Sequence, residues 1–268
     1  DASADPLAQG EAPATPASAP APAAPKAPSD AAERRRRARA YEEPESLWAA
    51  IRDGQAVLLR GTWLLGRAGY VEEEVEVQTR VEVRYNEWVP ETTTVCRWAA
   101  RRDALLLPHR AQIEAEHPEA IMPVEECEAA HARLHEVVDV ATKDFPSDGR
   151  KEATREQLDA VPVFVLSHCW EHPSHPDPEA RTLRALAEAL AGTWAKSNRG
   201  LRPESGLPLY RAWGLADVGV FVDWASLYQD KPQGTRTAEQ TACFKRALAN
   251  MSLWYAHRLT TVLLAWGQ

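Results

Sequence analysis

Three largely apolar runs stand out in the second half of the chain: "VPVFVLS" (161–167), "VGVFVD" (218–223) and "TTVLLAW" (260–266). Runs of this length with almost no polar interruption are typical of strands that a parallel sheet buries on both faces. We therefore predict a strand at each of the three runs.

Two amphipathic segments separate these runs. After the first run, Asp177 and Pro178 have the characters of a helix N-cap and a first-turn proline, and apolar residues then recur at helical spacing. These apolar residues are Leu183, Leu186, Ala187, Leu190 and Trp194. Before the third run, Thr237 and Gln240 have the spacing of a capping box. The apolar stripe that follows consists of Phe244, Ala247, Leu248, Met251 and Tyr255. Strands that alternate with helices in this order predict an α/β fold with a parallel sheet and right-handed crossovers.

The hydrophobic period changes in the first half of the chain. Valines alternate with charged residues between 70 and 85, which predicts a long strand with one solvated face, in an antiparallel ribbon with 92–100. Residues 44–54 predict a short helix. Its expected buried residues are Leu47, Trp48 and Ile51. Residues 109–143 have a helical composition that two prolines interrupt, and 144–160 are expected to form a connector.

Composition divides the chain further. Residues 1–31 are almost wholly Ala, Pro, Ser and acidic residues, which bury too little surface to offset the entropy of ordering. The four arginines that follow predict a solvated helix face or, as the alternative, a nuclear-import or anion-binding patch. We predict a disordered tail at 1–40, an accessory α+β region at 41–145 and an α/β domain at 146–268.

Charge and cysteine content limit the function classes. The net charge of −8 argues against a general nucleic-acid binder, and the absence of any eighteen-residue apolar stretch argues against a membrane span. Four cysteines without paired spacing indicate reduced thiols, and hence a cytoplasmic location. There is no secretory signal pattern. The first residue is Asp rather than Met, so we expect a fragment or a processed product.

A cluster of residues that can bind metals follows the first apolar run: His168, Cys169, His172 and His175 lie within eight positions. Zinc accepts these ligand types, but a structural zinc site usually takes paired ligands from two separated segments. No second cluster occurs in the sequence, and three prolines nearby favour a stiff, exposed loop. We therefore predict no metal site and keep zinc binding as the less favoured alternative. Cys169 is expected to be an inert packing residue rather than a nucleophile.

The same runs resemble a known family. "VFVLSHCW" (163–170) is similar to the first-strand signature of heterokaryon-incompatibility (HET) domains, and "VFVDWASLYQD" (220–230) resembles their second strand. Residues 236–267 resemble the helix and third strand that follow. HET domains belong to the Toll/interleukin-1 receptor (TIR)-like superfamily, so the resemblance implies a flavodoxin-like parallel sheet over about 161–268.

The chain departs from the family in two ways. His168 stands where the family usually has Tyr, and Glu171 stands where it usually has Gly. A TIR-like sheet has five parallel strands, whereas this chain provides three. Either the chain is a fragment, or its N-terminal half completes the sheet in a different way. We favour a fragment, with a sheet that is incomplete at the C-terminus.

The resemblance also implies a candidate reaction, because some TIR-like domains cleave NAD at the nicotinamide–ribose bond. They use a glutamate early in the helix after the second strand, and Glu239 matches that position. A carboxylate there stabilises the oxocarbenium character of the ribose, with Asp223 assisting. The alternative is that Glu239 only complements the dipole of its helix, and that Asp223 caps a loop.

In an open parallel sheet, ligands lie outside the carboxyl ends of the strands. Ser167, His168, Trp170 and Trp224 are therefore the candidate ligand-binding residues, and the two tryptophans are alternatively packing residues. We expect no bound cofactor, with NAD as a substrate. The two functional hypotheses are an NAD hydrolase and a non-catalytic signalling module that binds protein partners or itself.

Overall fold

The computed structural model of the protein describes residues 35, 38–84, 87–133, 163–197, 200–230 and 234–265. The predicted connector at 144–160, the four-arginine run apart from Arg35, and almost all of the predicted tail lie outside these residues. The last residues of the predicted tail, 38–40, are helical.

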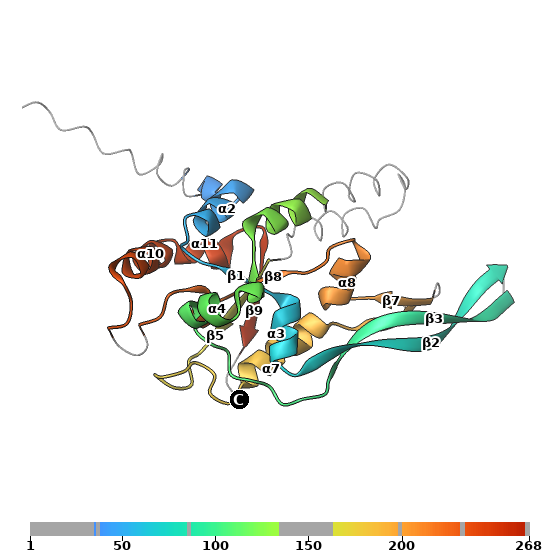
Figure 1. The fold of residues 1–268 in the computed structure, drawn as a ribbon. Coiled ribbons are helices and arrows are strands. Elements are labelled where there is room, and N and C mark those ends of the chain that lie inside the picture. The colour runs from blue at the N-terminus through green and yellow to red at the C-terminus, as the bar shows by residue number, and fades with distance from the viewer. Residues whose placement is uncertain are drawn as a thin grey trace, which may run out of the picture.

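A five-stranded sheet forms the centre of the fold, with the strand order β4-β1-β8-β5-β9 (Figure 1). The three predicted strands are its adjacent members β8 (Gly219–Val222), β5 (Val163–His168) and β9 (Thr260–Ala265). β5 pairs in parallel with both neighbours, so the prediction of three parallel strands is confirmed. Their carboxyl ends consequently meet at one edge of the sheet.

The rest of the sheet corrects the prediction of an all-parallel sheet. β1 (Leu58–Arg60) pairs antiparallel with β8 and with β4 (Ile121–Met122), so the sheet is mixed. β1 and β4 come before the predicted domain boundary between residues 145 and 146, and the other three strands come after it. Both sides of the boundary therefore contribute strands to one sheet.

The predicted helical stretch at 109–143 is correspondingly shorter and divided. It contains α4 (Arg110–Glu116), a 3-10 turn (Pro118–Ala120), β4, and a helix that begins at residue 124. The prolines at 118 and 123 follow the ends of α4 and β4. This placement is expected, because proline cannot continue a helix or a strand ladder.

Helices cover both faces of the sheet. Successive side chains of a strand point to opposite faces, so Leu58 and Phe221 belong to one buried cluster, and Leu59 and Val222 to the other. The first face carries α2 (Pro44–Arg52), α10 (Ala238–Ala249) and α11 (Met251–Ala256); the second carries α3 (Gly61–Arg67), α7 (Arg181–Ala191) and α8 (Gly206–Ala212). As predicted for α2, Leu47 and Trp48 are buried, whereas Ile51 is half-buried.

The helix after β5 begins later and ends earlier than predicted. α7 starts at Arg181 rather than next to Asp177, and it ends at Ala191, so Trp194 lies in β6 (Trp194–Ser197), paired with β7 (Gly200–Pro203). The end is set by Gly192, which has φ 68° and touches Gly206 so closely that a Cβ on Gly206 would lie 2.6 Å from the Gly192 Cα. A side chain at either position would force α7 and α8 apart.

The predicted capping box at Thr237 is confirmed, with Gln240 as its second member. The stripe after it corresponds to two helices rather than one, because α10 stops at Ala249 and α11 begins at Met251. Ala247 is fully buried, whereas Leu248 is 49% exposed, so the assignment of Leu248 to the buried stripe was wrong.

The antiparallel ribbon is confirmed as β2 (Tyr70–Arg84) and β3 (Glu87–Ala100). It extends away from the central sheet (Figure 1). At its base, Glu73 pairs with Arg101 and Arg97.

Candidate functional site

The candidate site lies where β5 and β8 end. Asp223 follows β8 as the first residue of the short helix α9 (Asp223–Ser226). Its carboxylate accepts a hydrogen bond from the Trp170 ring nitrogen (3.0 Å) and one from the Trp224 amide (2.6 Å). The structure therefore brings together three of the predicted site residues, on the loop after β5 and at the end of β8.

Trp224 is the packing centre of this edge. Its side chain is 3% exposed, and its ring lies edge-on to that of Trp170 with 5.5 Å between the centroids. The indole nitrogen donates to the Leu107 carbonyl at 2.9 Å. Trp224 is thus a buried packing residue here, whereas Trp170 is 39% exposed.

His175 fixes the loop after β5 to the same carbonyl. Its Nδ1 accepts from the Asp177 amide at 3.0 Å, so the neutral ring carries its hydrogen on Nε2, which lies 3.0 Å from the Leu107 oxygen. The Leu107 carbonyl therefore receives two side-chain donors from the strand-end loops.

Asp177 is 6% exposed, and one carboxylate oxygen accepts from the Leu183 amide at 2.8 Å. It thereby satisfies the first turn of α7, as a helix-capping aspartate does, although the helix starts three residues later than predicted. The other oxygen, Oδ1, is buried and has no hydrogen-bond partner among the described residues, and the same holds for Nδ1 of His168. Both residues line a small cavity of about 10 Å³ beneath Trp224.

The remaining residues of this loop are more open. Ser167 is half-buried, whereas Cys169 and His172 are exposed. His172 Nδ1 lies 2.6 Å from the Ser174 hydroxyl. Within the described ranges, which include all four residues of the cluster discussed for zinc, no three metal-binding side chains converge.

Glu239 lies elsewhere. It is exposed on the first turn of α10. In the described part of the chain, no hydrogen bond or ion pair joins it to Asp223 or to the other strand-end residues. Its role in catalysis stays a prediction.

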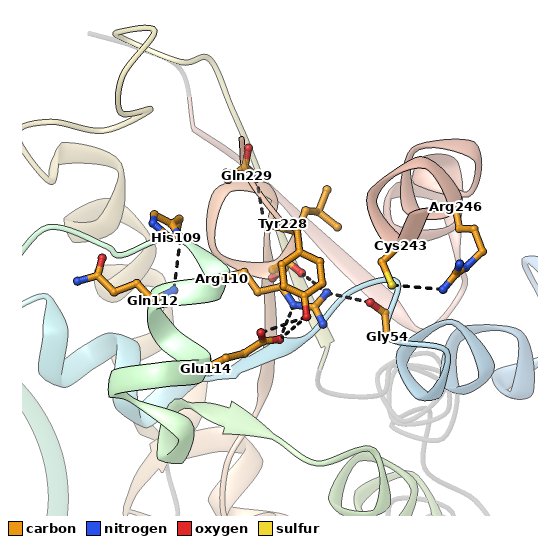
Figure 2. Close-up of polar contacts among 11 residues, drawn as sticks. Gly54, His109, Arg110, Gln112, Glu114, Tyr228, Gln229, Cys243 and Arg246 are labelled. Carbon is orange, nitrogen blue, oxygen red and sulfur yellow. Dashed lines mark hydrogen bonds and ion pairs between the residues drawn. The ribbon is translucent and has the colours of Figure 1, made fainter. Parts of the chain in front are cut away.

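A second polar cluster, which the sequence did not predict, includes Tyr228 from the segment that follows Asp223 (Figure 2). Arg110 of α4 is 4% exposed, and its guanidinium lies over the Tyr228 ring at 3.9 Å. It pairs with Glu114 at 2.8 Å and donates to the Gly54 carbonyl at 2.9 Å. We call Arg110, Glu114 and Tyr228 the arginine clamp.

Tyr228 completes the arginine clamp through its hydroxyl, which donates to Glu114 at 3.0 Å. Burial is the main cause that raises the pKa of the Tyr228 hydroxyl, so the group stays protonated and remains a donor at neutral pH. The next residue, Gln229, donates to the Asp223 carbonyl at 2.9 Å (Figure 2). The clamp and Gln229 together hold the segment that follows Asp223.

Comparisons with protein-family models, with characterised proteins and with solved structures find no match to this chain. Within the described ranges, every helix is too short or too polar to cross a bilayer.

Proposed function

We propose that the protein is a TIR/HET-like α/β module that acts through protein association. The order of its parallel strands supports a flavodoxin-like relationship: the second strand in sequence, β8, and the third, β9, flank the first, β5. A flavodoxin-like sheet begins with the same 2-1-3 order. The quoted signature strings coincide with these strands and with α10.

Association is favoured over catalysis by the small size of the cavity at the strand ends. Trp224 and His175 fill the space outside the ends of β5 and β8, and the cavity that remains measures about 10 Å³. Ligand pockets for small molecules usually measure about 300–1,000 Å³. This small volume is the observation that carries the proposal.

The outer edge of β9 offers a surface for association. Among the described residues, no strand pairs with this edge, and the segment "TTVLLA" contains no charge or proline of the kind that protects edge strands. Leu264 is 62% exposed on it. An unprotected edge of this kind favours pairing with a further strand.

Sedimentation velocity tests the association. We expect the wild-type chain to self-associate with rising concentration, and Leu264→Glu to weaken this by at least tenfold in dissociation constant, because a charge on the edge opposes strand pairing. Leu248→Glu is the matched control, since Leu248 is similarly exposed but lies on α10. A monomer at all concentrations, or equal effects of both substitutions, contradicts association through β9.

NAD hydrolysis is the second candidate, favoured by the contact between the exposed ring of Trp170 and the Asp223 carboxylate at the strand ends. In this reaction the bond between the ribose C1′ and nicotinamide breaks, water bonds to C1′, and a proton is released. Movement of the loop bearing Trp170 would have to open the site.

The test is nicotinamide release from NAD by the full chain, with Glu239→Gln and Asp223→Asn as variants. Release that Glu239→Gln abolishes supports hydrolysis with Glu239 as its central carboxylate. Release that survives this change removes the role of Glu239, and no release at any NAD concentration leaves association as the function.

A further inference from the structure

Two buried polar atoms belong to residues that line the cavity beneath Trp224. Asp177 Oδ1 and His168 Nδ1 are both buried, and neither has a hydrogen-bond partner within the described part of the chain. Leaving a buried polar atom without a partner costs roughly 1–3 kcal/mol. Such atoms are therefore usually satisfied by a bound molecule.

The size of the cavity decides what that molecule is. Its volume of about 10 Å³ matches the roughly 10–15 Å³ that one water molecule needs. The walls are mostly apolar, with Leu166, Leu183, Leu186 and Val222 among them. Of the other polar side chains in the lining, His175 and Trp224 already bond to Leu107, and Thr182 contributes a hydroxyl.

We propose that this cavity binds a single water molecule that bridges His168 Nδ1 and Asp177 Oδ1, and that the bridge sets the tautomer of His168. A carboxylate oxygen only accepts, so the water donates to Asp177. The negative carboxylate favours the positive end of an N–H dipole nearby, so His168 carries its hydrogen on Nδ1 and donates it to the water. The hydrogen-free Nε2 is then left as an acceptor at the end of β5.

Two of the other described histidines, His175 and His257, have the opposite arrangement, which gives an internal reference. His175 Nδ1 accepts from Asp177 N, and His257 Nδ1 accepts from the Leu259 amide at 3.1 Å. Both rings therefore carry their hydrogen on Nε2. Among these three residues, only His168 is expected in the Nδ1–H form.

Nitrogen-15 NMR of the imidazole rings tests the proposal in the full chain at about pH 8.5, well above the ordinary His pKa of about 6.5. We expect the His168 Nδ1 resonance at the protonated position and its Nε2 resonance at the unprotonated position, with the reverse for His175 and His257. A crystal structure is expected to show one water within hydrogen-bond distance of both atoms. His168 in the Nε2–H form, or a cavity without that water, overturns the proposal.

Two variants locate the cause of the tautomer. Asp177→Asn removes the negative charge, and the Nδ1–H form is expected to lose its dominance. Among the lining residues, Thr182 carries the side-chain hydroxyl; Thr182→Val removes it while keeping the side-chain volume, and His168 is expected to stay unchanged. A changed tautomer in Thr182→Val, or an unchanged one in folded Asp177→Asn, contradicts the assigned bridge. If Asp177→Asn fails to fold, the wild-type tautomer and the crystal water still decide the question.

Discussion

The two halves of the described chain contribute to one sheet in very different ways. Residues 163–265 provide three parallel strands of four to six residues, each part of a continuous apolar run. Residues 38–133 provide two antiparallel strands of three and two residues, together with a ribbon that leaves the sheet. Both halves of the chain therefore contribute residues to the same core, and the two are expected to unfold together.

The largest effect is expected in the parallel half. Phe221 of β8 is fully buried and stacks on Trp254 of α11, with 4.8 Å between ring centroids. Phe221→Ala is expected to lower the free energy of unfolding by about 3–5 kcal/mol, because it leaves a cavity in the core. Urea denaturation measures the loss. Leu264→Ala, on the exposed side of β9, is the control and should cost less than about 0.5 kcal/mol.

The next effect tests whether the antiparallel half shares that core. Leu58 of β1 is fully buried, and Leu58→Ala is expected to cost about 2–5 kcal/mol. Tryptophan fluorescence and far-UV circular dichroism should shift to the same lower urea midpoint, because both halves belong to one cooperative unit. Two separated transitions would show that the halves are independent domains.

A smaller effect is expected from the arginine clamp, which joins the two halves through side chains. Arg110→Ala removes hydrogen bonds to Glu114 and Gly54, and hydrogen bonds to charged groups contribute roughly 1.5–3 kcal/mol. The free energy of unfolding from urea titrations should fall by that amount. Arg52→Ala is the matched control: Arg52 pairs with Glu45 and Glu128 on the surface, where ion pairs contribute little, so its removal should cost much less. Equal losses of unfolding free energy in the two variants would show that the arginine clamp does not stabilise the contact between the halves.

The smallest effect at neutral pH concerns His257, whose Nε2 lies 3.1 Å from the Glu43 carbonyl of the first half. Burial lowers the pKa of His257 below its ordinary value of 6.5. The unfolded chain therefore binds the proton more readily, and the contribution to stability is complete above about pH 6.5 and falls as the pH drops through the folded-state pKa. Urea midpoints across this range should fall more steeply for wild type than for His257→Gln. Parallel curves for the two proteins would exclude this contribution.

The sequence predicted the parallel half well because its signals are local. A continuous apolar run defines β5 or β8 without reference to distant residues, and the capping box at Thr237 needs only four positions. The split of the last helical stripe at Asn250 was missed, because apolar residues keep helical spacing across the break. The short strands β1 and β4 were missed because two or three residues carry no period.

The candidate site was predicted in part for the same reason. Polar residues at strand ends are visible in the sequence, so Trp170 and Asp223 were found, and the structure joins them by a hydrogen bond. The arginine clamp was not found, because Arg110 and Tyr228 come from distant segments and meet only in the folded chain. Arg110 also looks like any surface arginine of a helix until its 4% exposure is known.

The contact between Gly192 and Gly206 has a practical consequence for anyone who engineers this protein. At this crossing, backbone lies directly on backbone, so an inserted residue, a fluorescent label or a fused tag has no space there. The exposed surface of α10 around Leu248 is a far safer attachment point.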